Sequence, residues 1–388
     1  MKNYAKRFLV FWIAVVMACT WMIRAGAEAT PTAEPSADMS LPCASAILMD
    51  AATGQVLYEQ NADAALPPAS VTKIMTLLLV MEAIDEGRIA LADMVAVSAN
   101  AASMGGSQVY LKEGETMSVE EMLKCVIIAS ANDCAVALAE FVAGSEEAFV
   151  QAMNDRADEL GMKNTHFENT NGLDDTVTAH LTSARDIAIM SRELISHEKI
   201  LEYSGIWMDT IRDGSFGLTN TNRLVRFYPG CTGLKTGSTA KAKFCISATA
   251  KRDGLSLICV IMAAETRDVR NATAAKLLDW GFANYGLYQS EAREYTIPIK
   301  GGVASQLQLR GEPFTACIPK GQGNKVSAEV ILPEMLSAPV GKGDAIGEIV
   351  YRLGENEIGR VPILASEGVE KMDFGTLFCR LLAQFLLI

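Results

Sequence analysis

The stretch that decides the fold is PPASVTKIMT (Pro67–Thr76), which runs directly into the apolar segment LLLVM (77–81). Prolines immediately before an apolar run are a normal signal for the start of a helix. In a helix that begins here, Ser70 and Lys73 lie one above the other on the same face. The segment that follows has no polar face, so this helix is expected to be buried in a domain core.

The pair formed by Ser70 and Lys73 suggests nucleophilic chemistry. A serine hydroxyl is a poor nucleophile until a base removes its proton, and an amine one helical turn away is placed to do so. The N-terminal tip of a helix also favours developing negative charge, through its free N–H groups and its dipole. Taken alone, these two residues fit an ordinary buried helix with an exposed lysine in its first turn better than a catalytic pair.

Two further polar motifs lie next to apolar segments. The helical pattern of residues 119–139 is interrupted by Ser130-Ala131-Asn132-Asp133, and such residues usually mark a break between helices because they compete for backbone hydrogen bonds. Lys235-Thr236-Gly237 precedes a predicted hairpin of strands 244–250 and 255–263, where a glycine lets another backbone or a ligand come close. Alone, the first motif also fits a helix–helix turn and the second a surface turn.

The remaining segments define the organisation of the chain. Runs 44–50 and 55–59 predict a second hairpin. Residues 85 to about 235 are mostly helical in pattern. From about residue 292 to 366, short alternating segments interrupted by Gly and Pro predict a small all-β domain. Amphipathic helices are predicted at 182–194 and 272–285.

The N-terminus has the pattern of a secretory signal peptide, residues 1–27. A basic start is followed by the apolar segment 8–18 and by the cleavage site Ala25-Gly26-Ala27. Residues 28–40, rich in Ala, Thr, Pro, Ser and Glu, are typical of a linker. The formal charge of −12 becomes more negative once the basic signal is removed, which argues against nucleic-acid binding.

The cysteines and histidines do not indicate a metal site. The nine cysteines are scattered without a C-x-x-C pair or a neighbouring histidine cluster. Cys245 and Cys259 lie in strand-like apolar runs and are interpreted as small buried side chains. A Ser-His-Asp mechanism would have to use His166, His180 or His197, and none of these histidines has a nucleophile motif nearby. No metal or other cofactor is expected.

The C-terminal segment 372–388 predicts an amphipathic helix. Its apolar residues recur at helical spacing over a length that is too short to span a bilayer, which takes about 20 residues. Such a helix suits the membrane interface, although it could also dock on its own protein. The apolar positions are Phe374, Leu377, Phe378, Leu381, Leu382 and Phe385.

Together, Ser-x-x-Lys, Ser-x-Asn and Lys-Thr-Gly in this order form a specific set. The chain resembles the low-molecular-mass penicillin-binding proteins, the serine-type D-alanyl-D-alanine carboxypeptidases, over about residues 40–365. The resemblance extends to Asp50–Gly54, Asn171-Gly172-Leu173 and Trp280-Gly281-Phe282. It implies an α/β fold, with an antiparallel sheet flanked by helices and a helical subdomain in residues 41–290. A β-rich domain (292–366) and an amphipathic anchor helix (372–388) would follow.

The resemblance also implies a site and a substrate. Ser70 would attack the bond between two D-alanines at the end of a peptidoglycan stem peptide, with Lys73 and Ser130 moving protons. β-Lactam antibiotics would acylate the same serine. The backbone N–H groups of Ser70 and Ser238 would form the oxyanion hole. The residues expected to bind substrate are Asn132, Lys235, Thr236, Gly237, Ser238 and Arg270.

The chain departs from the family pattern at three positions. Ser238 follows Lys-Thr-Gly, where relatives vary, Ala131 replaces a common Gly, and Lys243 stands where a Gly is usual. None of these residues supplies a side chain to the expected proton transfers. The departures therefore put in doubt only the side-chain role of Ser238 and the local entry into the strand.

Three alternative functions share part of this sequence pattern. A class A-like β-lactamase would need a glutamate such as Glu168 to activate water, but the loop around Glu168 does not match that family. A DD-endopeptidase that cuts peptidoglycan cross-links is a closer alternative. A non-catalytic penicillin-binding sensor would carry transmembrane and signalling segments, which are not visible in the sequence.

Overall fold

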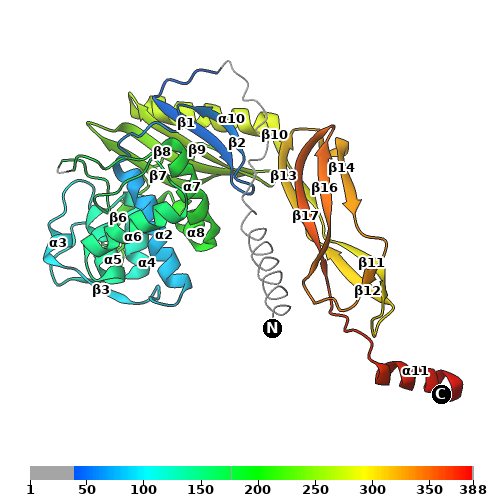
Figure 1. Cartoon of the computed structure of the whole chain (residues 1–388). Helices are drawn as coiled ribbons and strands as arrows, with labels where there is room; N and C mark the ends of the chain where they lie inside the picture. Colours follow the sequence, from blue (N-terminus) through cyan, green and yellow to red (C-terminus); the bar gives the residue numbers. More distant parts are fainter. Residues whose placement is uncertain (1–38, 176, 387–388) are drawn as a thin grey trace, which may run out of the picture. The chain divides into compact units, whose positions relative to one another are not determined.

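The part of the chain that carries the three motifs is built on one antiparallel sheet (Figure 1). The computed structural model describes residues 39–175 and 177–386, so the predicted signal peptide and the linker up to residue 38 lie outside the described residues. The five strands occur in the order β2 (Val56–Gln60), β1 (Ser45–Asp50), β9 (Leu255–Ala264), β8 (Lys243–Arg252) and β7 (Cys231–Thr239). Both predicted hairpins are present, β1–β2 and β8–β9.

Both faces of this sheet are buried, as the sequence of its central strand β9 requires. Side chains alternate between the faces of a strand, and in β9 both alternating sets are apolar. Ile258, Val260 and Met262 join one core, and Leu257 and Ile261 join the other. Helix α10 (Arg267–Asn284) packs over the second set, and α7 (Ala184–Ser196) packs over the first, on the opposite face (Figure 1).

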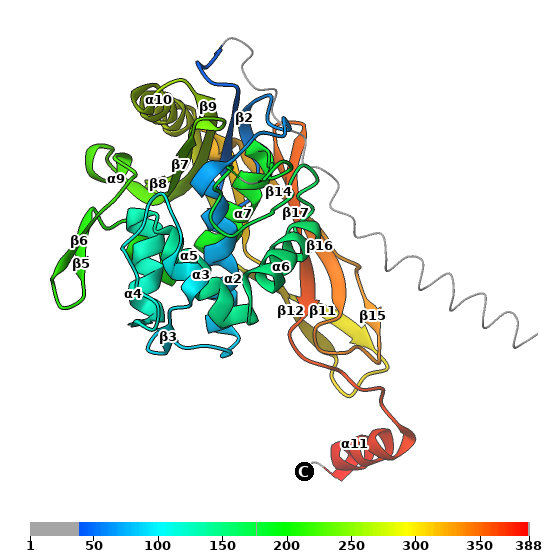
Figure 2. The ribbon, with the colours of Figure 1, turned by 90° about the vertical axis from the view of Figure 1, so that its left-hand side faces the viewer.

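The segment between the hairpins is mainly helical, as predicted, and α2 (Lys73–Asp85) lies in its middle. Figure 2 shows α5 (Asn132–Ala143), α6 (Glu146–Glu159) and α7 around α2, and all three pack against it. The structure adds two small two-stranded sheets, β3–β4 and β5–β6, that the helical pattern did not predict, because strands of three or four residues carry little periodicity. The other elements are β3 (Met94–Ala96), α3 (Ala99–Ala102), β4 (Thr116–Ser118), α4 (Val119–Lys124), α8 (Glu198–Ser204), β5 (Met208–Ile211), β6 (Phe216–Thr219) and α9 (Leu224–Phe227).

The start of α2 differs from the sequence expectation. Ser70 lies in a 3₁₀ turn, Ala69–Thr72, and the α-helix begins only at Lys73. Ala69 has a φ of 50°, so the chain enters this turn through a left-handed residue and not through a regular helical turn. The serine and lysine still share one face, because residues three apart are also aligned in a 3₁₀ turn.

The C-terminal strands form a second, separate core, which agrees with the predicted all-β character. β10 (Tyr285–Ser290) pairs with β13 (Phe314–Pro319). A six-stranded sheet contains β14 (Val326–Ile331), β16 (Ala345–Leu353), β17 (Asn356–Ala365), β12 (Gln306–Gly311), β11 (Arg293–Lys300) and β15 (Leu336–Ser337), in that order. Strand β10 follows α10 directly and begins at Tyr285, before the predicted end of the first domain at residue 290. The domain bounds 41–290 and 292–366 therefore stay predictions.

The terminal segment is helical, as its pattern predicts. Helix α11 spans Phe374–Leu386. Among the residues that the structure describes, no helix combines the length and the apolar character needed to cross a membrane.

Candidate active site

Strand β7 lies against the 3₁₀ turn that carries Ser70, and Gly237 makes this contact possible. A Cβ atom on residue 237 would lie 2.7 Å from the carbonyl oxygen of Pro68 and 2.8 Å from the backbone nitrogen of Ser70. Real Cβ atoms do not approach other atoms so closely, so a side chain here would push the strand and the turn apart. The glycine of Lys-Thr-Gly therefore sets the distance between the edge strand and the serine.

Ser70 and Lys73 are in direct contact. The Lys73 Nζ atom donates hydrogen bonds to Ser70 Oγ at 2.9 Å and to the carbonyl oxygen of Asn171 at 2.8 Å. The Lys73 side chain is completely buried. Burial, and to a smaller degree the positive charge of Lys235, lower the pKa of Lys73 well below its ordinary value, while Asp133 opposes the shift. The amine beside the serine therefore loses its proton more readily than a lysine in water.

Ser130 lies at the helix break that the sequence predicts. Helix α4 continues into a π-helical turn, Cys125–Ala129, and Ser130 then adopts a left-handed conformation with a φ of 64° before α5 starts. π-Helical turns and strained residues often occur at functional sites. The Lys235 Nζ atom donates to Ser130 Oγ at 2.8 Å. Thus the second serine is joined to the second lysine, as the first serine is joined to the first lysine.

Lys235 is as fully buried as Lys73. Burial, followed by the charge of Arg270, lowers the pKa of Lys235 from its ordinary value to about 7. Its ammonium group also donates to the carbonyl oxygen of Thr236 at 3.0 Å. A buried lysine with this pKa can lose or keep its proton near neutral pH.

Asn132 and Asp133 fix the loop that faces the start of α5. Asn132 Nδ2 donates to the carbonyl oxygen of Gly105 at 2.7 Å, and Asp133 accepts from the backbone N–H groups of Val109 and Leu111 at 3.0 and 3.1 Å. The Oδ1 atom of Asn132 is buried, and it has no hydrogen-bond partner among the described residues. A buried acceptor without a partner is costly, so this oxygen is available for a donor that is not part of the chain.

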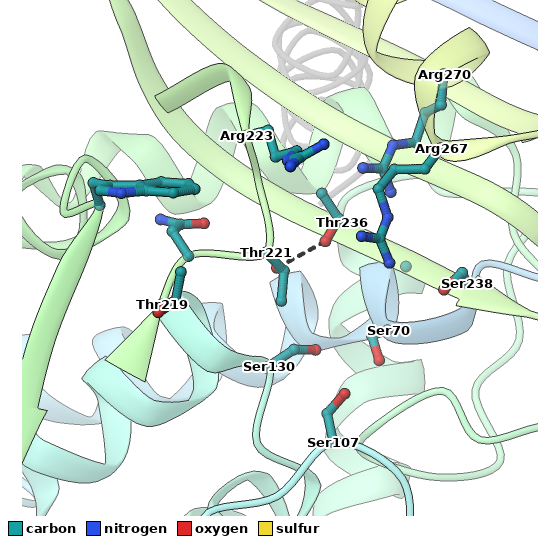
Figure 3. Close-up of a pocket in the computed structure, with 13 residues that line it drawn as sticks. Ser70, Ser107, Ser130, Thr219, Thr221, Arg223, Thr236, Ser238, Arg267 and Arg270 are labelled. Atoms are coloured by element: carbon teal, nitrogen blue, oxygen red, sulfur yellow. Dashed lines mark hydrogen bonds between the residues drawn. The ribbon is translucent and has the colours of Figure 1, made fainter. Parts of the chain in front are cut away.

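These elements enclose a cavity of about 390 Å³ (Figure 3). Of the residues predicted to form the site, six line the cavity, namely Ser70, Ser130, Thr236, Gly237, Ser238 and Arg270. Lys73 and Lys235 are buried behind its wall, each bonded to one of the two serines. Asn132 is not among the lining residues. The structure thus brings both serines and both lysines together around one cavity.

Several lining residues were not assigned a role from sequence. Thr236 Oγ1 donates to Thr221 Oγ1 at 2.8 Å, which links strand β7 to the loop before α9. The unassigned residues are Ser107, Trp207, Thr219, Asn220, Thr221, Arg223 and Arg267. They come from loops, from the end of β6 and from the first turn of α10. None belongs to a motif, and only the polar character of loop 220–223 could have drawn attention to it.

The structure shows the backbone conformation at two of the departures from the family pattern, Lys243 and Ala131, and the position of Glu168. Lys243, which stands where a glycine is usual, has a φ of 55° at the start of β8. A glycine would adopt this left-handed conformation without strain. Ala131 has a φ of −60°, which any residue adopts. Glu168 accepts hydrogen bonds from the backbone N–H groups of Thr178 and Ala179 and does not line the cavity.

An antiparallel sheet with helices on both faces, and a serine–lysine pair under a Lys-Thr-Gly edge strand, define the class of serine enzymes with the penicillin-binding-protein fold. Residues 30–266 match the family model described as D-alanyl-D-alanine carboxypeptidase, and residues 283–371 match the C-terminal domain of penicillin-binding protein 5. The D-alanyl-D-alanine carboxypeptidase DacF of Bacillus subtilis (strain 168) is 41% identical over 388 residues, which cover 98% of this chain and 99% of that protein.

Solved structures agree with this relationship. Penicillin-binding protein 5 from Haemophilus influenzae is 31% identical, with a TM-score of 0.77, over 86% of this chain and 99% of that one. Penicillin-binding protein D2 from Listeria monocytogenes, in its ampicillin-bound form, is 32% identical, with a TM-score of 0.58, over 63% of this chain and 99% of that one. The chain belongs to the peptidase S11 family of D-alanyl-D-alanine carboxypeptidases. It is a serine hydrolase that acts on peptidoglycan.

Proposed function

We propose that Ser70 is the nucleophile and that the reaction proceeds through an acyl-enzyme. Ser70 Oγ attacks the carbonyl carbon between the two terminal D-alanines of a pentapeptide stem. A bond forms between Oγ and the acyl group, the C–N bond to the last D-alanine breaks, and water then hydrolyses the ester. The observation that carries this proposal is the 2.9 Å hydrogen bond between Lys73 Nζ and Ser70 Oγ at the cavity wall.

Lys73 acts as the general base for this attack. Its lowered pKa, caused first by burial and then by Lys235, supports a neutral amine that accepts the Ser70 proton. Ser130 then passes a proton to the amine of the departing D-alanine. Its contact with Lys235 Nζ at 2.8 Å supports this relay, because the ammonium group stabilises negative charge on the serine oxygen.

The substrate is held by backbone and charged groups around the cavity. The N–H groups of Ser70 and Ser238 form the oxyanion hole, which the close packing at Gly237 supports. The unpartnered Oδ1 atom of Asn132 accepts a hydrogen bond from a peptide N–H of the stem. Lys235, Thr236 and Arg270 supply the positive charge and the hydroxyl that a terminal carboxylate requires.

The proposal is tested with Ser70→Ala and intact mass spectrometry. We expect the wild-type protein to gain the mass of one benzylpenicillin and to release D-alanine from an N-acylated peptide that ends in D-Ala-D-Ala. Ser70→Ala should lose both the mass gain and the release. Ser107→Ala, which removes a different hydroxyl from the same cavity, should still gain the mass of penicillin. D-alanine release by Ser70→Ala at the wild-type rate would refute the mechanism.

Benzylpenicillin is a fitting probe because a solved relative, the D2 protein, is described in an ampicillin-bound form. Slow loss of the adduct supports a carboxypeptidase, whereas rapid release with turnover of penicillin would support a β-lactamase. Release of D-alanine from a pentapeptide, compared with cleavage of a cross-linked dimer, separates the carboxypeptidase from a DD-endopeptidase.

We also propose that the protein acts outside the cytoplasmic membrane and is held at its surface. Residues 1–27 would direct export, 28–40 would serve as a linker, 41–290 and 292–366 would form the two domains, and 372–388 would bind the lipid interface. The apolar side chains of α11 are exposed, among them Phe374 (82%) and Phe385 (93%), as an interfacial helix requires.

The membrane proposal is tested by vesicle sedimentation. The mature chain should sediment with vesicles of phosphatidylglycerol and phosphatidylethanolamine, and a chain that ends at residue 371 should stay in solution. Equal sedimentation of both proteins would refute an anchor in α11. D-alanine release by the shortened chain provides the control for folding.

A further inference from the structure

One end of the cavity carries more positive charge than a single carboxylate requires. Arg223, Arg267 and Arg270 all line it, and none of the thirteen lining residues, all in the described part of the chain, is acidic. Lys235 is buried directly behind the same wall. Which of these cations touches the substrate depends on which of them still has free donors.

Arg270, the arginine that the family resemblance assigns to the carboxylate, uses three of its five N–H donors within the protein. Its Nε and Nη2 atoms both donate to Asn271 Oδ1, at 3.0 and 2.9 Å, and its Nη1 atom donates to the carbonyl oxygen of Cys245 at 3.4 Å. The Nε–Nη2 edge is one of the two edges with which a guanidinium grips a carboxylate by paired bonds, and Asn271 occupies it. Only 3% of the Arg270 surface is exposed.

Arg267 has the opposite properties. It is the first residue of α10, one turn before Arg270. Its side chain is exposed, and within the described residues it makes no side-chain hydrogen bond or ion pair. Figure 3 shows the Arg267 side chain reaching into the cavity between Arg270 and Ser238, on the side of Ser70. All five of its N–H donors are therefore available to a ligand.

The two arginines also repel one another. Burial lowers the pKa of Arg270 most, and the positive charge of Arg267 lowers it further. Two cations held together without an anion between them raise the free energy of the empty site, and a bound carboxylate removes that repulsion. The arrangement therefore favours an anion next to Arg267 more than either arginine would alone.

We propose that Arg267 makes the direct contact with the terminal carboxylate of the substrate, and that Arg270 is a positioning residue that supplies a fixed positive charge behind it. This inference rests on the proposed function, because it assumes that the D-Ala-D-Ala terminus lies between Ser70 and the arginines. It assigns the selection of a free C-terminus to a residue outside the three sequence motifs.

The test compares two peptides that differ only at the C-terminus, an N-acylated D-Ala-D-Ala and its C-terminal amide. Arg267→Ala should lower kcat/KM for the acid on the order of 10- to 100-fold, the range of a charge-assisted contact. The loss should appear mainly in KM, because the carboxylate is bound in both the ground state and the transition state. For the amide, kcat/KM should change by less than about fivefold, the scale of exposed charge effects.

Three further variants separate a direct contact from a general effect of charge. Arg267→Lys should recover part of the preference for the acid. Arg223→Ala removes the same charge from the same cavity and should cost less than Arg267→Ala. Arg310→Ala, which removes an exposed arginine from β12 in the C-terminal sheet, should leave both substrates unchanged.

Equal losses for acid and amide in Arg267→Ala, or a loss no larger than that of Arg223→Ala, would overturn the proposal. Failure of the proposed function is recognised separately. In that case the wild-type protein would not release D-alanine from the acid peptide, or Ser70→Ala would still do so.

Discussion

The cavity region and the C-terminal strands differ in how many polar side chains they bury. Around the cavity, Lys73 and Lys235 are completely buried, and Ser130 and Asn132 are 4% and 2% exposed. In strands β10–β17, among the described residues, no charged side chain is buried. The buried polar atoms include the hydroxyl of Tyr351, which bonds Ser290 Oγ at 3.0 Å, and the hydroxyl of the partly buried Tyr295, which has no partner in the described part of the chain. One region holds charge in its interior and the other excludes it.

This difference separates the residues that stabilise the fold from the residues that take part in the reaction. Burying an amine costs free energy that apolar packing elsewhere must offset. The cost is tolerated where burial changes chemistry, because it lowers the pKa values of both lysines. The C-terminal core has an ordinary alternating apolar pattern, and none of its described charged side chains is buried. Substitutions around the cavity should therefore change kcat/KM, and substitutions in the C-terminal core should change the free energy of unfolding.

The largest expected effect comes from a single methyl group added at the contact between β7 and the Ser70 turn. Gly237→Ala should lower kcat/KM on the order of 100-fold, since misplacement of a reacting group by about 1 Å has this cost. Gly286→Ala, in β10, meets no atom within 4 Å of the new Cβ and should leave kcat/KM unchanged. D-alanine release measures both variants. A Gly237→Ala enzyme with full activity would show that strand and turn are not held at a fixed distance.

A smaller effect on kcat/KM is expected from a change in pH, because it acts through one residue beside the cavity, Lys235. Lys235 is cationic below its pKa of about 7 and neutral above it. The contribution of Lys235 to the attraction for the terminal carboxylate is therefore lost as pH rises through 7, and kcat/KM should fall above that value. A bound carboxylate stabilises the cation, so the corresponding limb of kcat should lie at higher pH. A kcat/KM profile that stays flat to pH 9 would contradict the assignment.

The smallest effect is expected in the C-terminal core and should be one of stability alone. Tyr351→Phe removes the hydroxyl that bonds Ser290 Oγ but keeps the ring that stacks on Phe314 at 4.1 Å. The free energy of unfolding of this region should fall by about 1 kcal/mol, while kcat per folded molecule stays the same. Thermal unfolding and D-alanine release, measured on the same sample, check both statements. A change in kcat would show that the two regions are coupled.

The serines and lysines of the site could be predicted from sequence because their motifs depend on local geometry. Ser70 and Lys73 share one face in a 3₁₀ turn as well as in an α-helix. The prediction that the two residues are in contact was therefore correct although the predicted start of the helix was wrong. The break at Ser130 follows from residues that disfavour helix interiors. The fold class followed from the resemblance and from the two hairpins, both of which form.

The rest of the cavity could not be predicted, because tertiary packing places it. Thr221 reaches the cavity because its loop is held by side-chain bonds, such as that from Asn222 Nδ2 to the carbonyl oxygen of Gly233 at 2.8 Å. Arg267 and Arg270 are three residues apart on one helix, yet only one of them is buried. No spacing rule distinguishes them, since the difference lies in what surrounds the helix.

The order of the central sheet has a consequence for how the chain folds. Strand β1, which lies before Ser70 in the chain, pairs with β9 over Ser45–Asp50 and Leu257–Met262. The first strand therefore lacks its central neighbour until residue 262 has been synthesised. Contacts between such distant segments slow folding. On a ribosome-bound chain, the pairing of β1 with β9 therefore has to wait until nearly the whole first domain has emerged.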